Sequence, residues 1–234
     1  MKIGLLKCYS VPEAMFHISG DISDIFNNFF EKFAPEIELE VYDVVNGDFP
    51  DLDGELKGFL CTGSPHSAYD DEAWIIELKK FIQNIYHQKK KIVGICFGHQ
   101  IIAEALGGKV VRSSKGWGIG VQAIKINKIM EWMKPFSDEL NILASYQDQI
   151  ESLPPQGSLL ASNSHCRYFM YEIENIVLGI QGHPEFDKKF VETLYKSRVE
   201  SIGRNIVSTA ISSLNGSIHP HIFAEWINNF FQKT

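Results

Sequence analysis

Long apolar runs are missing from this chain, and cysteine and proline are scarce. The 234 residues include four cysteines and nine prolines. The apolar start at residues 1–8 is interrupted by Lys7 and is too short for a secretion signal, and no small-residue cleavage site follows it. No other stretch approaches the roughly 20 apolar residues that cross a bilayer. We therefore expect no membrane association.

The four cysteines show neither a paired CxxC spacing nor the framework of a secreted disulfide protein; they are Cys8, Cys61, Cys96 and Cys166. Free thiols persist in the cytosol, so we expect a cytoplasmic protein. The formal net charge is -7, and basic residues are scattered apart from residues 89–91. Duplex binding needs a concentrated basic face, so nucleic acid is not an expected partner.

The pattern of apolar residues predicts one α/β domain over residues 1–234, without repeats or a low-complexity linker. Helices are predicted at 21–33, 71–88, 100–106, 188–214 and 221–231. Strands are predicted at 2–8, 38–44, 58–62, 91–95, 109–112, 121–126, 142–146, 158–162, 168–171 and 176–181. This order favours a three-layer sandwich with a mixed, largely parallel central sheet, on which two C-terminal helices from about residue 188 pack.

The most informative segment is residues 94–100, which read Gly-Ile-Cys-Phe-Gly-His-Gln. A buried strand ends at Cys96 and a helix follows, with glycines two residues to either side, as in a nucleophile elbow. Such a turn lifts the sulfur to the carboxyl edge of the sheet, and the helix N-terminus favours its thiolate form. It also aims the Phe97 N–H at a developing oxyanion.

A buried structural role is the usual fate of a cytosolic cysteine. We expect that role for the other three cysteines, because none of them lies in such a turn. Cys96 is predicted to be a nucleophile.

A candidate base follows the predicted strand at 176–181, where residues 182–185 read Gly-His-Pro-Glu. Two parallel strands ending at one edge could bring His183 beside Cys96. His183 and Glu185 are two residues apart and share a face in extended chain, so Glu185 can orient the imidazole. A metal site here would need a third ligand, and none stands at helical or hairpin spacing, so we expect no metal and no cofactor.

Together these motifs resemble the class I glutamine amidotransferase family, in particular stand-alone members similar to the glutaminase domain of GMP synthase. Residues 94–100 resemble its nucleophile motif and residues 182–185 its histidine–glutamate motif. Residues 62–65 (Thr-Gly-Ser-Pro) resemble its oxyanion loop, and residues 144–149 (Ala-Ser-Tyr-Gln-Asp-Gln) a later loop near the active site.

The resemblance implies a flavodoxin-like sandwich, a Cys96–His183–Glu185 triad and a covalent γ-glutamyl thioester that releases ammonia or an amine. It further implies that Gly63 and Ser64 supply the oxyanion loop. The resemblance also implies that Gln100 contacts the glutamine portion of a small-molecule substrate and that Trp117 borders its pocket.

Two positions depart from the family pattern. Ser64 replaces the second glycine of the oxyanion loop, where the donor is a backbone N–H that serine can also supply. Tyr146 stands where histidine is common, which leaves the role of that position open.

Three functions remain as hypotheses. The chain could be an amidotransferase that passes ammonia to an acceptor or to a separate synthetase subunit, since it has no Walker-type phosphate loop of its own. It could instead be a free-standing hydrolase of γ-glutamyl peptides or conjugates that uses the same triad. A non-catalytic regulatory module is the third, and the presence of all three triad residues argues against it.

Overall fold

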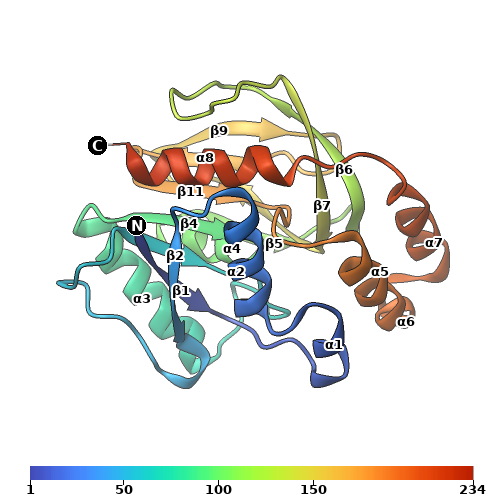
Figure 1. Cartoon of the computed structure of the whole chain (residues 1–234), viewed down its shortest axis with the longest axis horizontal. Coiled ribbons are helices and arrows are strands. Elements are labelled where there is room, and N and C mark those ends of the chain that lie inside the picture. The colour runs from blue at the N-terminus through green and yellow to red at the C-terminus, as the bar shows by residue number, and fades with distance from the viewer. Residues whose placement is uncertain (234) are drawn as a thin grey trace.

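A nine-stranded mixed sheet forms the centre of the computed structural model, which describes residues 1–233 (Figure 1). Its strands are β1 (Lys2–Lys7), β2 (Glu38–Asp43), β3 (Gly58–Cys61), β4 (Lys91–Ile95), β6 (Gly118–Ile126), β7 (Glu139–Tyr146), β9 (Gly157–Ser162), β10 (Met170–Ile173) and β11 (Val177–Ile180). Their order is β2-β1-β3-β4-β11-β10-β9-β6-β7, parallel from β2 to β11 and antiparallel beyond. Two further strands, β5 (Lys109–Arg112) and β8 (Asp148–Ser152), pair with each other.

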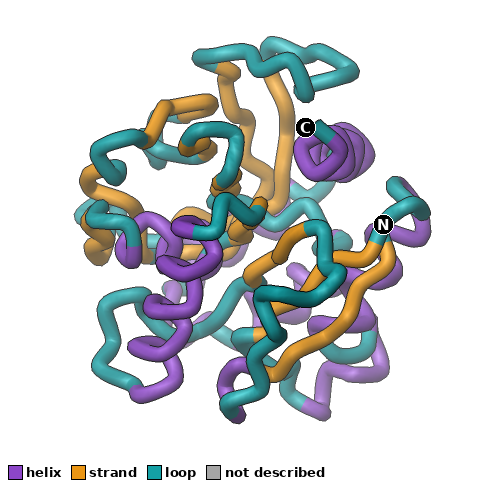
Figure 2. The backbone as a smooth tube through the Cα atoms, turned by 90° about the vertical axis from the view of Figure 1, so that its left-hand side faces the viewer, coloured by secondary structure: helices purple, strands orange, loops and turns teal. Residues whose placement is uncertain are grey.

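Helices cover both faces of this sheet (Figure 2). They are α1 (Phe16–Ser19), α2 (Ile22–Phe33), α3 (Ala73–His87), α4 (Phe97–Ala105), α5 (Lys188–Ser197), α6 (Val199–Ile202), α7 (Arg204–Ser213) and α8 (Pro220–Gln232). Successive side chains of β4 point to opposite faces of the sheet and so enter two separate cores. Val93 and Ile95 pack with α2, α5 and α8, whereas Ile92 packs with α3 and α4. The predicted α/β fold class, a sandwich around a mixed sheet, is confirmed.

Both C-terminal helical regions bury their apolar faces in the core shared with α2. Phe190 and Leu194 of α5 are buried there, as are Trp226 and Phe230 of α8. These faces therefore lie in the same core as α2.

Local details of the helices differ from the prediction. The expected helix at 188–214 is three helices, because the chain leaves helical geometry at Arg198 (φ -108°, ψ 13°) and again at Gly203, whose φ is +102°. Helix α4 begins at Phe97 rather than at residue 100, and the strand β8 and the short helix α1 were not predicted. The break at Arg198 affects the site described below.

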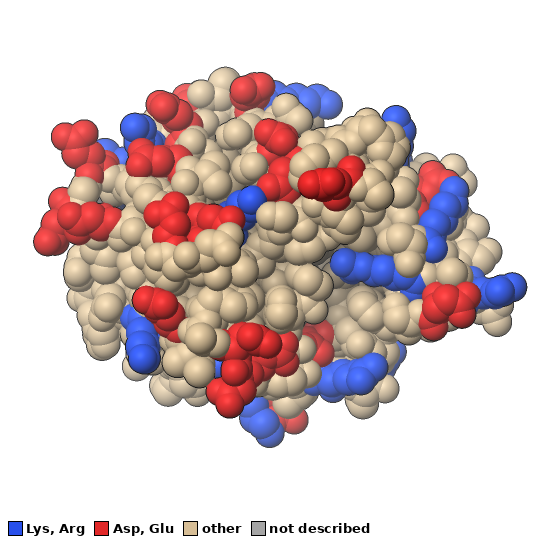
Figure 3. Space-filling model, turned by 90° about the horizontal axis from the view of Figure 1, so that it is seen from below, with Lys and Arg blue, Asp and Glu red and all other residues tan. Residues whose placement is uncertain are grey.

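The surface carries both signs of charge. On the face in Figure 3, lysines and arginines are spread among aspartates and glutamates and do not form one basic patch.

Along the described chain, 1–233, every helix is too short or too polar to traverse a lipid bilayer.

The contact between α4 and β3 generates a stability prediction. A methyl group added at Gly98 would lie 2.2 Å from the carbonyl oxygen of Cys61, a backbone atom that cannot move aside. We expect Gly98→Ala to lower the free energy of unfolding by about 3 kcal/mol, measured by urea denaturation. Gly47→Ala is the control, because Gly47 has a φ of +82° but open space around it; it should cost only about 1 kcal/mol. Equal losses in the two variants would contradict the steric argument.

Candidate active site

The turn between β4 and α4 contains Cys96 in an unusual backbone conformation. Its φ is 52° and its ψ is -103°, a region that costs a non-glycine residue about 1–3 kcal/mol. The Cys96 N–H donates to the Ile180 carbonyl at 2.8 Å, and the Cys96 carbonyl accepts from the Gln100 N–H at 3.0 Å. These bonds hold the strained turn between two parallel strands and the helix. The elbow that the sequence predicted is therefore present.

Two glycines allow this turn. A methyl group at Gly94 would lie 2.5 Å from the Gly98 backbone, and one at Gly98 would strike the carbonyl of Cys61. The helix can start directly at the end of the strand only because both side chains are missing.

His183 follows β11 and is fixed from several sides. Its backbone N–H donates to the Leu143 carbonyl of β7 at 2.8 Å, and its ring Nδ1 lies 2.7 Å from Glu185 Oε1. The imidazole stacks on the Phe186 ring, with centroids 4.1 Å apart and planes 8° from parallel. Backbone, carboxylate and aromatic ring together leave the imidazole one orientation.

The His183–Glu185 pair is buried, with side-chain exposures of 5% and 0%. Burial by itself lowers the pKa of His183, but the charges of Glu185 and Cys96 outweigh it and raise that pKa to about 10. Within residues 1–233, the other carboxylate oxygen, Glu185 Oε2, has no hydrogen-bond partner. The carboxylate of Glu185 therefore interacts mainly with the imidazole. Because its pKa is raised to about 10, His183 holds a proton at neutral pH.

Cys96 and His183 border the same cavity, together with Gly63. A methyl group at Gly63 would lie 3.0 Å from His183 Cε1 and 3.8 Å from Cys96 Cβ. Gly63 is thus packed against both side chains. The structure brings Cys96, His183 and Glu185 together from the ends of two adjacent parallel strands, β4 and β11.

Two backbone N–H groups are candidates for an oxyanion hole. Phe97 is the first residue of α4, and an N–H at that position has no acceptor within its own helix. The Thr62 hydroxyl accepts from the Cys8 N–H and donates to the Gly63 carbonyl, both at 3.0 Å. Because the peptide is trans and planar, the Ser64 N–H points away from Thr62.

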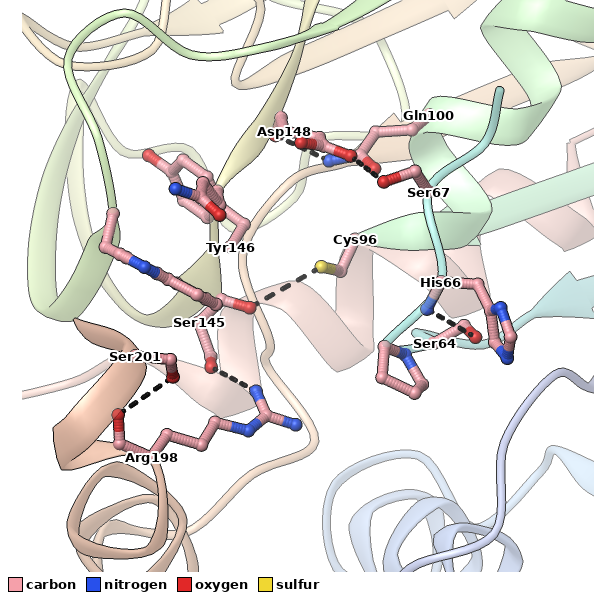
Figure 4. Close-up of a pocket in the computed structure, with 13 residues that line it drawn as sticks. Ser64, His66, Ser67, Cys96, Gln100, Ser145, Tyr146, Asp148, Arg198 and Ser201 are labelled. Carbon is pink, nitrogen blue, oxygen red and sulfur yellow. Dashed lines mark hydrogen bonds between the residues drawn. The ribbon is translucent and has the colours of Figure 1, made fainter. Parts of the chain in front are cut away.

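A polar cavity of about 250 Å³ lies on the other side of Cys96 (Figure 4). Gln100 and Trp117, both predicted near a substrate, line it together with Tyr146 and Ser64. The Tyr146 hydroxyl donates to Gln122 Oε1 at 2.8 Å, so it does not donate to the Cys96 sulfur.

Gln100 is held by its own hydrogen bonds. Its Nε2 donates to the Asp148 carbonyl at 2.7 Å and to Gln181 Oε1 at 3.1 Å. With both amide hydrogens engaged, Gln100 can offer a ligand only its carbonyl oxygen.

Sequence reasoning missed several residues of the site. Gln181 is fully buried, and its Nε2 lies 3.7 Å from Cys96 Sγ; a glutamine at the end of an apolar strand was the available signal. The carbonyl of Ser145 lies 3.9 Å from the same sulfur. Arg198, which lines the cavities on both sides of Cys96, carried no signal because it fell inside a predicted helix.

In the part of the chain that is described, no cluster of three or more His, Cys, Asp or Glu side chains could hold a metal ion.

Comparison with known proteins agrees with this geometry. Residues 35–195 match the family described as glutamine amidotransferase class-I. The chain is 39% identical over 176 residues to γ-glutamyl peptidase 3 of Arabidopsis thaliana, spanning 71% of this chain and 70% of that protein. It is 33% identical over 132 residues to the glutamine-hydrolyzing GMP synthase of Pyrobaculum aerophilum, spanning 56% of this chain and 24% of that protein.

A solved structure shares the fold across the whole chain. The glutamine amidotransferase of Thermotoga maritima superposes with a TM-score of 0.78 at 17% identity, covering 100% of this chain and 99% of that chain. The resemblance that the motifs indicated is confirmed. The chain belongs to the class-I glutamine amidotransferase family.

Proposed function

We propose that this enzyme hydrolyses γ-glutamyl amide bonds, with Cys96 as nucleophile, His183 as acid and base, and Glu185 as the group that orients His183. The observation that carries the proposal is the buried His183–Glu185 pair, whose histidine borders the same cavity as the strained Cys96. A cysteine, a histidine and a carboxylate in this relation form a nucleophilic triad.

The first half of the reaction forms a thioester. The Cys96 thiolate attacks the γ-carbonyl carbon, and the resulting oxyanion accepts hydrogen bonds from backbone N–H groups of Phe97 and of the loop at Gly63 and Ser64. His183 gives its proton to the amide nitrogen, the C–N bond breaks, and the free amine leaves. The γ-glutamyl group remains bonded to the sulfur.

The second half reverses the roles. His183 is now neutral and removes a proton from water, which attacks the thioester carbonyl. The C–S bond breaks, glutamate leaves, and the thiolate and the imidazolium are restored. Glu185 stabilises the imidazolium in the free enzyme and again when it re-forms, which fits the raised pKa of His183.

The γ-glutamyl hydrolase form of this chemistry is supported by the match to γ-glutamyl peptidase 3 over most of both chains. A glutamine amidotransferase that passes ammonia to a separate synthetase subunit is the second candidate, supported by the match to GMP synthase. A small-molecule substrate serves both. The free cysteines support the proposed cytoplasmic location.

Removal of the thiol should abolish turnover. Cys96→Ala is expected to lower kcat/KM for any γ-glutamyl substrate by at least about 10⁴-fold, because no other group can form the thioester. Mass spectrometry of wild-type protein quenched during turnover should detect one γ-glutamyl group on Cys96. Cys166→Ala is the control: burial raises the pKa of the Cys166 thiol to about 12, so this thiol is inert. Full activity in Cys96→Ala would refute the proposal.

Loss of the orienting carboxylate should change both rate and titration. Glu185→Gln keeps the shape but removes the charge that raises the pKa of His183. We expect kcat to fall by about 10²–10⁴-fold. NMR of histidine-labelled protein should find wild-type His183 protonated up to about pH 10 and deprotonating at a lower pH in the variant. An unshifted titration would show that Glu185 does not act on the imidazole.

A further inference from the structure

Cys96 stands between two cavities of different character. The first, described above, is polar and extends towards Gln100 and Asp148. The second is lined mainly by apolar side chains; they are Tyr9, Ile22, Phe186, Phe190 and Leu194. Five residues border both cavities, namely Ser64, Pro65, Cys96, Ser145 and Arg198. A substrate attacked at Cys96 can therefore extend to either side of the sulfur.

The proposed chemistry assigns one part of the substrate to each cavity. The nitrogen that leaves must be within reach of His183, because this imidazolium donates the proton. His183 borders the apolar cavity and does not border the polar one. The leaving group therefore occupies the apolar cavity, and the γ-glutamyl portion occupies the polar one.

The size of the apolar cavity limits what it can hold. Its volume is about 40 Å³, and one water-sized group needs roughly 10–15 Å³ on the same measure. The cavity thus has room for about three or four carbon atoms. Phe190 and Leu194 are 2% and 6% exposed, so the wall is part of the core and cannot retreat far. A branched aliphatic side chain fits these limits.

Arg198 adds a charge to the same cavity. Its Nη1 lies 3.5 Å from Ser145 Oγ, and Figure 4 places the guanidinium in the cleft between Ser145 and the loop with Ser64. Among residues 1–233, no carboxylate lies within 4.0 Å of this half-buried guanidinium. A guanidinium in a cleft without an acidic partner is suited to bind the carboxylate of a ligand in a bidentate manner.

We infer that the apolar cavity is a leaving-group site for an α-amino acid with an aliphatic side chain, whose carboxylate pairs with Arg198. In an α-amino acid the carboxylate carbon is two bonds from the leaving nitrogen, so the carboxylate can lie at Arg198, on the border of the two cavities, while the side chain enters the apolar one. The inference rests on the proposed hydrolysis and names its substrate class, γ-glutamyl dipeptides. Ammonia released from glutamine would use neither the apolar wall nor Arg198.

The proposed pairing of Arg198 with the carboxylate of the leaving amino acid is tested with two substrates that differ only in that carboxylate. They are γ-glutamyl-leucine and γ-glutamyl isoamylamide, in which the leaving amine is leucine without its carboxyl group. Arg198→Gln should lower the ratio of kcat/KM for the first substrate to that for the second by about 10–100-fold, mainly through KM. Arg204→Gln removes the same charge from an exposed position that lines none of these cavities and should leave the ratio unchanged.

An equal loss for both substrates in Arg198→Gln would overturn this assignment, because it would place the guanidinium on the glutamyl α-carboxylate. The apolar wall is tested in the wild-type protein, so that no variant has to fold. There γ-glutamyl-leucine should exceed γ-glutamyl-glycine in kcat/KM by at least about tenfold. Equal values, or a preference for glycine, would overturn the aliphatic assignment.

Failure of the inference differs from failure of the proposed hydrolysis. If hydrolysis itself is wrong, no γ-glutamyl compound is turned over and Cys96 carries no adduct. If only the leaving-group site is wrong, the adduct forms and the substrate ratios do not change.

Discussion

The strained backbone conformation of Cys96, with its positive φ, is the constraint on which the rest of the site depends. It exists because α4 packs directly on the end of β3, where Gly98 touches the Cys61 carbonyl and the Gly98 N–H donates to Thr62 O at 3.1 Å. The same contact fixes the start of the loop that carries Gly63. The proposed nucleophile and the proposed oxyanion loop are thereby parts of one rigid unit, and the packing around the strained residue offsets the cost of its conformation.

The remaining parts of the site are tied to this unit through the antiparallel half of the sheet. The bridge from His183 to Leu143 fixes the proposed base against β7. The Tyr195 hydroxyl donates to the Ala144 carbonyl at 2.6 Å and accepts from the Gly120 N–H at 3.0 Å, which docks α5 on β6 and β7. Arg198, at the end of α5, is therefore held in a fixed position relative to β6 and β7 rather than on a free loop.

Features that depend only on residues close together in the sequence could be predicted from it. The elbow at residues 94–100 and the pair His183 and Glu185 each depend on a strand end and on local spacing, and both lie where they were expected. The alternation of strands and helices also predicted the sandwich fold, because the spacing of apolar residues within each segment indicates whether that segment is a strand or a helix.

Features that depend on distant partners could not be read in this way. Gln181 contributes to the site because Gln100 lies opposite, on another element. The apolar spacing continues across residues 188–214, so it does not reveal the break at Arg198; only Gly203 marks an interruption in this stretch. The strand β8 is polar and partly exposed, and pairing with β5 is what defines it.

The interruption of the C-terminal helices at Arg198 has an evolutionary consequence. In the reaction we propose, bond cleavage depends on residues at the sheet edge, whereas the choice of what is cleaved depends on a segment that follows Glu185 in the chain. Substitutions there can retune selectivity while the machinery of acyl transfer stays intact. Descendants of one ancestor could thus diverge towards new amines by altering a single helix terminus.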